Sequence, residues 1–182
     1  MGLSGSPKND KERVKPKHEK QLLVKETEEA YEIRDNLLCK YASYLKLLRV
    51  TAFVKRLFIN NCKKCKKRRG PLMTEELQAA EKFWIIQAQA VQVLKSDVRL
   101  RADEDGMLRC VGRVPNYHPV FLPRNSTLAT LIVQQVHEQM LHGVSTTMCR
   151  MRENYWIPKL RSLKKKVIRN CNVCRRYWKK PI

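Results

Sequence analysis

Apolar residues recur at helical spacing along the first half of the chain, and this pattern predicts helices. The spacing is loose over residues 22–38 and regular over 41–58, which indicates one long helix, or two abutting helices, ending near Asn60. A further helix is expected over 74–94. Residues 21–97 therefore form a helical region, which is more suited to packing than to catalysis.

The hydrophobic period changes from helical to alternating over residues 98–125. Asp105-Gly106 stands between two alternating runs, which is a strong sign of a β-hairpin. Val120-Phe121-Leu122 lies between Pro119 and Pro123 and adds a third strand. We therefore expect a small antiparallel β extension in this segment.

Three helices are predicted within residues 126–182. The first covers 127–141, with Ser126 or Thr127 as its N-cap and Gly143 as a left-handed C-cap. Its apolar positions follow helical spacing throughout, which indicates one buried side.

The second of these helices is expected to begin near Ser145 or Thr146 and to carry Tyr155. Trp156-Ile157-Pro158 breaks it, because proline disfavours helical geometry in the residue before it. The third helix covers 160–168. The predicted fold class is mainly α with a small antiparallel β element, ending in a three-helix, helix-turn-helix-like domain.

Two histidines and two cysteines bracket these three helices. Four residues separate His137 from His142, and two separate Cys171 from Cys174, a pair expected to close as a turn. Imidazole nitrogen and thiolate sulfur are ligands of tetrahedral Zn²⁺, so we predict one structural zinc held by these four side chains. The alternative is that the four residues are unrelated. Because about 50 residues make a thin core, a metal staple is favoured.

The chain is strongly basic, with 38 Lys+Arg against 17 Asp+Glu and a net charge of +21. Such charge implies a polyanionic partner, with nucleic acid first. Residues 1–20 are expected to be a disordered basic tail.

The basic residues gather in the segment from Gly143 to Ile182, where 12 Lys+Arg stand against one acid, Glu153. The alternative is that this charge is only a solvated face. The predicted nucleic-acid-binding residues are those of the third helix and its flanks: Lys159, Arg161, Lys164, Lys165, Lys166, Arg169, Arg175 and Arg176.

Two other groups of residues suggest metal sites less strongly. Cys62 and Cys65 form a second cysteine pair, but the basic residues around them favour an exposed basic linker near 61–71. Asp103-Glu104-Asp105 suggests Mg²⁺, although an acidic hairpin tip is usually only solvated.

The seven cysteines are an odd number, and the N-terminus lacks the apolar core of a secretory signal. These features favour a reducing compartment, so we expect a protein of the nucleus or cytoplasm that is not secreted. No apolar run approaches the ~20 residues of a membrane span, so a membrane is not an expected partner.

The His₂Cys₂ pattern, with Tyr155-Trp156-Ile157-Pro158 inside it and Arg175-Arg176 after it, resembles the zinc-binding N-terminal domain of retroelement integrases. Ordered blocks upstream resemble the BEL/Pao retrotransposon polyprotein where it enters the integrase. These blocks are Leu47–Ala52 with Arg56–Phe58, Pro71–Leu77 with Ala80-Glu81, and Asp105–Arg109 with Val111–Arg113 and His118–Pro123. The resemblance covers roughly residues 41–182.

The resemblance implies a role in DNA integration by a transposable element. It makes 126–182 an integrase-type zinc-binding domain whose partners are DNA ends, further copies of the chain or integrase subunits. The chain stops at Ile182, where the family's carboxylate catalytic core would begin, so we expect no enzyme activity. The alternatives are a portion of an active integrase polyprotein, with its core downstream or in trans, and a domesticated binding module.

Overall fold

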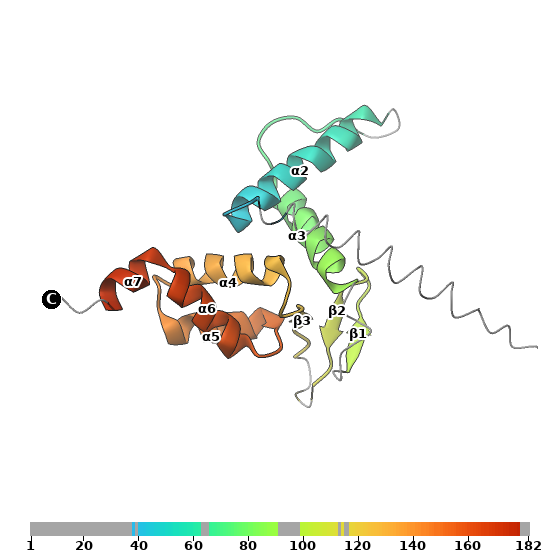
Figure 1. Ribbon diagram of the computed structural model, residues 1–182. Coiled ribbons are helices and arrows are strands. Elements are labelled where there is room, and N and C mark those ends of the chain that lie inside the picture. The colour runs from blue at the N-terminus through green and yellow to red at the C-terminus, as the bar shows by residue number, and fades with distance from the viewer. Residues whose placement is uncertain are drawn as a thin grey trace, which may run out of the picture.

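The computed structural model describes residues 38, 40–62, 66–90, 99–112, 114 and 117–178. Figure 1 shows α2 at the top, α3 below it, the strands beneath α3, and the remaining helices to the left. The predicted tail at 1–20, the pattern at 22–37 and the end of the second helix near Leu94 lie outside the described residues. The elements in chain order are α2 (Tyr44–Asn61), α3 (Thr74–Gln89), β1 (Leu100–Ala102), β2 (Leu108–Cys110), β3 (Val120–Phe121), α4 (Thr127–Gln139), α5 (Val144–Asn154), β4 (Tyr155–Trp156), α6 (Leu160–Asn170) and α7 (Asn172–Trp178).

The predicted fold class is confirmed: the described residues are mostly helical and include a small sheet. The hairpin of β1 and β2 and the third strand β3 form where the alternating pattern indicated. The sheet order is β1-β2-β3-β4, and the fourth strand pairs with β3 in parallel, so the sheet is mixed rather than antiparallel throughout. None of the helices in the described ranges combines the length and the apolar character needed to cross a membrane.

Helices α2 and α3 pack closely through small and medium side chains. Ala52 and Ala80 are buried between them, and the Trp84 indole donates to the Thr51 hydroxyl at 2.8 Å. Small residues at these positions let two helices approach each other closely. The predicted long helix is therefore confirmed over α2, and its inner side contributes to the common core.

A buried arginine fixes the start of α3 and the end of the basic linker. Arg56 forms a bidentate ion pair with Glu76 and also donates to the carbonyls of Gly70 and Pro71. The hydrogen bond from Arg56 lowers the pKa of Glu76 to about 2, so this carboxylate stays ionised beside its partner. Within the predicted linker, the described residues 66–71 are neither helix nor strand, whereas Asn61 still belongs to α2.

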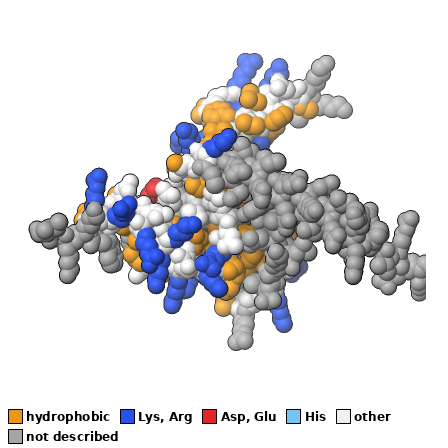
Figure 2. Space-filling model, viewed as in Figure 1, with side chains coloured by type: hydrophobic (Ala, Val, Ile, Leu, Met, Phe, Trp, Pro, Cys, Tyr) orange, Lys and Arg blue, Asp and Glu red, His pale blue; other side chains and the backbone are white. Residues whose placement is uncertain are grey.

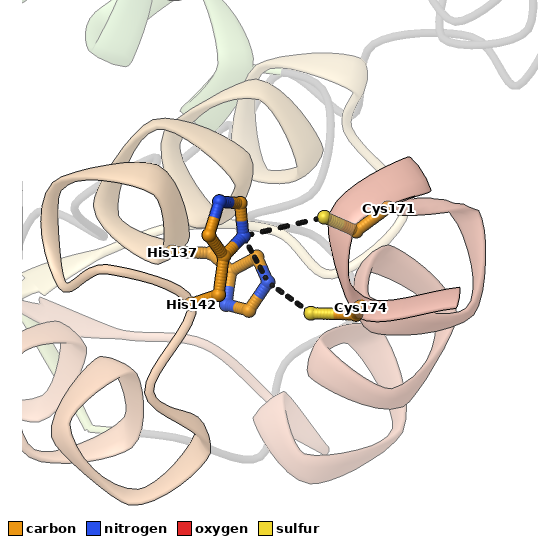
Figure 3. A group of neighbouring side chains, drawn as sticks. All are labelled: His137, His142, Cys171 and Cys174. Atoms are coloured by element: carbon orange, nitrogen blue, oxygen red, sulfur yellow. Dashed lines mark hydrogen bonds between the residues drawn. The ribbon is translucent and has the colours of Figure 1, made fainter. Parts of the chain in front are cut away.

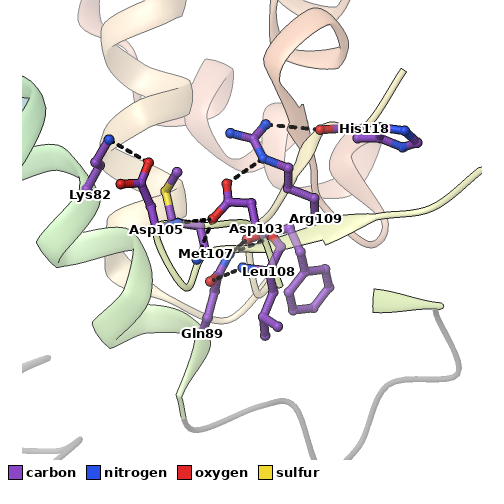
Figure 4. A network of polar contacts seen from close by, with 9 residues as sticks. Lys82, Gln89, Asp103, Asp105, Met107, Leu108, Arg109 and His118 are labelled. Atoms are coloured by element: carbon purple, nitrogen blue, oxygen red, sulfur yellow. Dashed lines mark hydrogen bonds and ion pairs between the residues drawn. The ribbon is translucent and has the colours of Figure 1, made fainter. Parts of the chain in front are cut away.

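The acidic residues of the hairpin close its turn instead of converging on an ion. The Asp103 carboxylate accepts from the backbone of Asp105 and Met107 and pairs with Arg109 at 2.7 Å, while Asp105 pairs with Lys82 (Figure 4). Gly106 adopts φ +78°, a left-handed conformation that favours glycine. The turn therefore fits the solvated-tip interpretation of these acids.

One buried glutamine joins α3 to the sheet. The Gln89 amide nitrogen donates to the carbonyls of Leu108 and Phe121 at 2.9 and 2.7 Å, and its oxygen accepts from the Leu108 backbone at 2.8 Å (Figure 4). Gln89 is 2% exposed. It therefore supplies buried hydrogen bonds to the backbones of two neighbouring strands, where polar groups need partners.

One carboxylate on α3 joins α2 to β4. Glu81 accepts from the hydroxyls of Tyr44 on α2 and Tyr155 on β4, each at 2.8 Å. Burial, with this carboxylate nearby, raises the pKa of both phenols, so they remain neutral donors. The buried apolar residues, from Leu38 to Val167, form one cluster. A single hydrophobic core therefore includes side chains from the N-terminal helices, the sheet and the C-terminal helices.

Helices α4 to α7 follow the predicted order, but several of their ends differ from the prediction. Ser126 caps α4 by accepting from the Ala129 backbone at 3.1 Å, as expected. The prediction that the second helix carries Tyr155 is wrong, because this residue pairs with Val120 in the sheet. The predicted turn at Cys171–Cys174 is also wrong, because the chain re-enters a helix, α7, at Asn172.

Replacing Gln89 with leucine should destabilise the fold strongly. The change removes the side-chain partner of the Leu108 amide in β2 and of the Phe121 carbonyl in β3, and each such buried group costs about 1–3 kcal/mol, so we expect a loss of about 2–5 kcal/mol. Chemical unfolding of the zinc-loaded chain measures this. The matched control is Gln78→Leu on the exposed side of the same helix, expected within about 0.5 kcal/mol of the parent. Equal effects of the two substitutions would contradict the bridging role.

Candidate metal centre

His137 lies in the last turn of α4, as predicted, and its ring is buried, with 1% exposure. One ring nitrogen, Nδ1, faces the Thr147 hydroxyl at 3.4 Å, and that hydroxyl donates onward to the Gly143 carbonyl at 2.5 Å. Because the Thr147 hydroxyl donates its hydrogen to a carbonyl, it can only accept a hydrogen bond from Nδ1–H of His137. This arrangement leaves the Nε2 lone pair of His137 free to bind a metal.

His142 reaches the same point because the backbone turns through two left-handed residues. Leu141 and His142 have φ values of 49° and 64°. The prediction that Gly143 is the left-handed C-cap of α4 is therefore wrong. Gly143 instead has φ −66° and is the N-cap of α5, so Ser145 and Thr146 do not cap that helix.

Gly143 is required for close approach rather than for its φ angle. A Cβ atom there would lie 2.3 Å from the Thr146 hydroxyl oxygen and 3.1 Å from the Met140 carbonyl. A larger residue would push the α4–α5 turn open. The same turn sets the direction of the His142 ring, so the glycine supports the histidine pair indirectly.

The two cysteines come from the junction of α6 and α7. Cys171 is the C-cap of α6, and Cys174 lies in the first turn of α7. The Arg175 amide donates to the Cys171 carbonyl at 2.9 Å, which starts the helical hydrogen-bond pattern between the two. A single helical turn therefore brings both sulfur atoms to one side, where the histidines lie.

The four side chains converge on one point (Figure 3). His137 Nε2 lies 3.2 Å from Cys174 Sγ, and His142 Nδ1 lies 3.2 Å from His137 Nε2 and 3.3 Å from Cys171 Sγ. All four ligand atoms fall within 4.8 Å of one another. Nitrogen and sulfur donors around a tetrahedral zinc are separated by about 3.3–3.8 Å, so the group fits one zinc ion.

Burial adjusts the protonation of this group. Burial, and then the neighbouring His142 ring, lower the pKa of His137, which favours the neutral imidazole that a metal requires. Burial and the adjacent Cys171 raise the pKa of Cys174. A nearby cation favours the Cys174 thiolate, and a divalent ion of the zinc type supplies that charge.

The other predicted sites behave differently. Within the described part of the chain, no further group of three or more metal-ligating side chains is found. Cys62 follows α2 and is exposed, while Cys65 lies outside the described residues. Seven of the eight predicted nucleic-acid-binding side chains are exposed, and Lys164 is half-buried; the set is Lys159, Arg161, Lys164, Lys165, Lys166, Arg169, Arg175 and Arg176.

Thr147 is the residue of this centre that the sequence did not reveal. Its 10-residue separation from His137 is uninformative by itself, and a threonine in a helix carries no motif. The position of Thr147 could have been a signal. A hydroxyl in the first turn of α5 can reach the Gly143 carbonyl before the helix and lies close to the end of α4, where His137 is.

Replacing Thr147 with valine should weaken zinc binding about 10–100-fold, because the partner that orients His137 is lost. A competition titration with a chromophoric chelator on the full chain measures the affinity. Thr146→Val is the matched control: this exposed hydroxyl also donates to the Gly143 carbonyl, at 3.1 Å, yet does not contact His137. Equal affinities of the two variants would reject the orienting role.

Comparison with known families agrees with this geometry. The family model of the integrase zinc-binding domain matches residues 124–180. Searches of curated proteins and of solved structures find no match to the chain. The matched range contains α4 to α7 and all four converging side chains. Residues 124–180 therefore form an integrase zinc-binding domain of the H2C2 type, with a His₂Cys₂ group suited to one zinc ion.

Proposed function

We propose that His137, His142, Cys171 and Cys174 hold one structural zinc, and that the module so formed binds nucleic acid. The observation that carries this proposal is the convergence of four ligand atoms within 4.8 Å inside a domain of the integrase zinc-binding family. Four protein donors complete a tetrahedral shell, so no position is left for a reacting water. The metal therefore acts on folding and not on catalysis.

The zinc fastens the end of α4 to the junction of α6 and α7. The buried apolar side chains of this module, among them Ile132, Met151 and Leu163, belong to the core that it shares with α2 and α3. The end of the module around α7 contributes little to that core, and there metal binding adds folding free energy that apolar packing does not supply. Loss of the ion would release α7 first, since that helix has seven residues and, among the described elements, packs mainly on α6.

The basic surface for nucleic acid is formed mainly by α6. Leu160, Leu163 and Val167 point into the core, so the five cations of this helix project toward solvent. Lys164, Lys165, Arg169 and the α7 residue Arg175 line one groove together with Val144 and Ile168. Figure 2 shows Lys and Arg side chains gathered over these helices.

The positive charges on this surface lie close enough together to raise the local electrostatic potential. Partial burial, and then Arg161, Lys165 and Arg152, lower the pKa of Lys164. None of the ion pairs found among the described residues involves the eight predicted side chains. A phosphate backbone would neutralise this field, and phosphate contacts carry no base information. Affinity for duplex DNA without strong sequence preference is therefore expected.

We further propose that the chain takes part in binding and assembly within a BEL/Pao-type integrase rather than in strand transfer. The upstream sequence blocks that resemble this lineage support the assignment, and they fall on α2, α3 and the sheet. The Asp103 carboxylate accepts from the hairpin turn, and the Asp105 carboxylate pairs with Lys82 of α3. A reading frame downstream that encodes a carboxylate core would favour the alternative of an active integrase polyprotein over a domesticated module.

The purified full chain should contain one zinc per molecule and lose helical content when a chelator removes it, because the metal joins α4 to α6 and α7. His142→Ala and Cys171→Ser should each abolish stoichiometric binding, as measured by elemental analysis and circular dichroism. His118→Ala and Cys149→Ser are matched controls, since both residues lie outside the cluster and should bind zinc normally. Unchanged metal content in both site variants would reject the assignment.

Replacing Lys164, Lys165 and Lys166 with alanine should flatten the salt dependence of DNA binding. Each lost phosphate contact removes about 0.9 from the slope of log affinity against log salt, so three lost contacts give a change of about 2–3. Fluorescence anisotropy with a labelled duplex at several salt concentrations measures it.

The matched control replaces Lys66, Lys67 and Arg69 with alanine, which removes the same charge from the linker before α3. Its slope should stay near that of the parent. If both triple variants change the slope equally, general charge rather than the α6 surface explains the binding.

A further inference from the structure

An aromatic side chain lies exposed where the sheet meets the C-terminal helices, on β4 beside β3 (Figure 1). Side chains alternate along a strand, so Tyr155 turns toward Glu81 while the next residue, Trp156, faces the opposite side. Trp156 is 46% exposed, and none of the aromatic or cation–π contacts found among the described residues involves its ring. A single exposed apolar residue is common, so the significance of Trp156 depends on what surrounds it.

Trp156 lines a groove of about 500 Å³, a volume in the range of small-molecule sites. The other apolar and aromatic residues that line this groove are Tyr117, Tyr155, Ile157, Pro158 and Leu160. The Tyr117 hydroxyl donates to the Arg152 carbonyl, which joins the segment before β3 to the end of α5. The ring of Trp156 is therefore part of a formed groove and not an isolated side chain.

The charged residues of this groove are all cations. Arg152, Lys159 and Arg161 line it, and each is exposed. None of the ion pairs found among the described residues involves them. Glu153, the one acid between Gly143 and Ile182, pairs with Arg150 instead. The groove therefore suits a ligand that combines a flat apolar part with negative charge, and a nucleotide has both.

The backbone at Lys159 is left-handed, with φ 54° and ψ 37°. An L residue seldom adopts this conformation, whereas glycine adopts it without strain. The chain nevertheless has a lysine here, and its side chain lines the groove. Strained backbone of this kind is concentrated at ligand-binding sites. The positive charge of Lys159, rather than the turn, therefore explains the residue at this position.

The groove continues into the basic surface of α6. Arg161 belongs to both, because it lines the groove and lies in the first turn of the helix. Partial burial is the main cause that lowers the pKa of Lys164, and the nearby charges of Arg161 and Arg152 add to it. The cations of the groove and those of α6 therefore lie close together. A strand whose phosphates follow α6 would bring its next bases to Trp156.

We propose that an unpaired nucleobase stacks on Trp156 in this groove, while the flanking phosphates contact Arg152, Lys159 and Arg161. This subsite rests on the nucleic-acid binding proposed above and adds to it a place for a single strand beside the duplex. Stacking on an aromatic ring tolerates every base, so the subsite selects unpaired structure rather than sequence.

Fluorescence anisotropy of the full zinc-loaded chain with two labelled DNA duplexes tests the proposal. The duplexes share one sequence, and the second carries a short unpaired extension of adenines. The parent should bind the extended duplex about tenfold more tightly, because base–aromatic stacking contributes a factor of this order per base. An extension of abasic nucleotides keeps the phosphates but lacks the bases, so it should lose most of this preference.

Three variants separate stacking from a structural role of the residue. Trp156→Leu should lose the preference and keep the affinity of the parent for the blunt duplex, whereas Trp156→Phe keeps an aromatic ring and should retain most of the preference. Phe58→Ala is the matched control, since it removes an exposed ring on α2 and should behave like the parent. Zinc content and circular dichroism verify that each variant is folded.

The outcomes distinguish this subsite from duplex binding itself. Equal affinities of the parent for the two duplexes, a preference that Trp156→Leu retains, or an equal loss of affinity for both duplexes in Trp156→Leu would each overturn the subsite. Duplex binding by α6 would stand in the first two cases. Binding of neither duplex by the parent would reject the proposed function and the subsite with it. If Trp156→Leu does not fold, the abasic extension decides: a preference that it retains overturns stacking.

Discussion

The arrangement of the C-terminal helices depends on the burial of one imidazole. His137 sits where α4, α5 and α7 meet, and a polar ring at that depth needs a partner on each nitrogen. Thr147 lies beside Nδ1, and the zinc ion that His137 would share with Cys174 is the proposed partner of Nε2. The position of α5 is fixed by the first contact and that of α7 by the second, so the helices are placed by polar requirements as much as by apolar packing.

The zinc-binding domain is joined to the segments that precede it in the chain. Its short strand β4 pairs with β3, Tyr155 shares the Glu81 carboxylate with Tyr44, and Gln89 fixes the β2 and β3 backbones to α3. These contacts are buried or partly buried, so they couple the N-terminal helices to the domain in one core. Helices α2 and α6 therefore both contribute side chains to one core, although they lie at opposite ends of the described chain (Figure 1).

Sequence reasoning succeeded where a local pattern decides the structure. The stripe in α4, its Ser126 cap and the Asp-Gly turn each depend on neighbouring residues, and the metal cluster follows from two short spacings. It failed where distant contacts decide. A two-residue strand such as β4 has no pattern of its own and exists because Val120 lies beside it. Gly143 suggested a left-handed cap, but crowding at Thr146 explains the glycine, and His142 adopts the left-handed angle itself.

On the proposed function, metal and nucleic acid act through the same two helices. Cys171 and Cys174 hold the junction of α6 and α7, and the cations that line one groove come from both sides of that junction. Phosphates that bind both helices favour the arrangement in which the sulfur atoms converge, and zinc favours the arrangement in which the cations share a groove. Ligands that prefer the same conformation strengthen each other's binding. A structural ion can therefore set nucleic-acid affinity without contacting the nucleic acid.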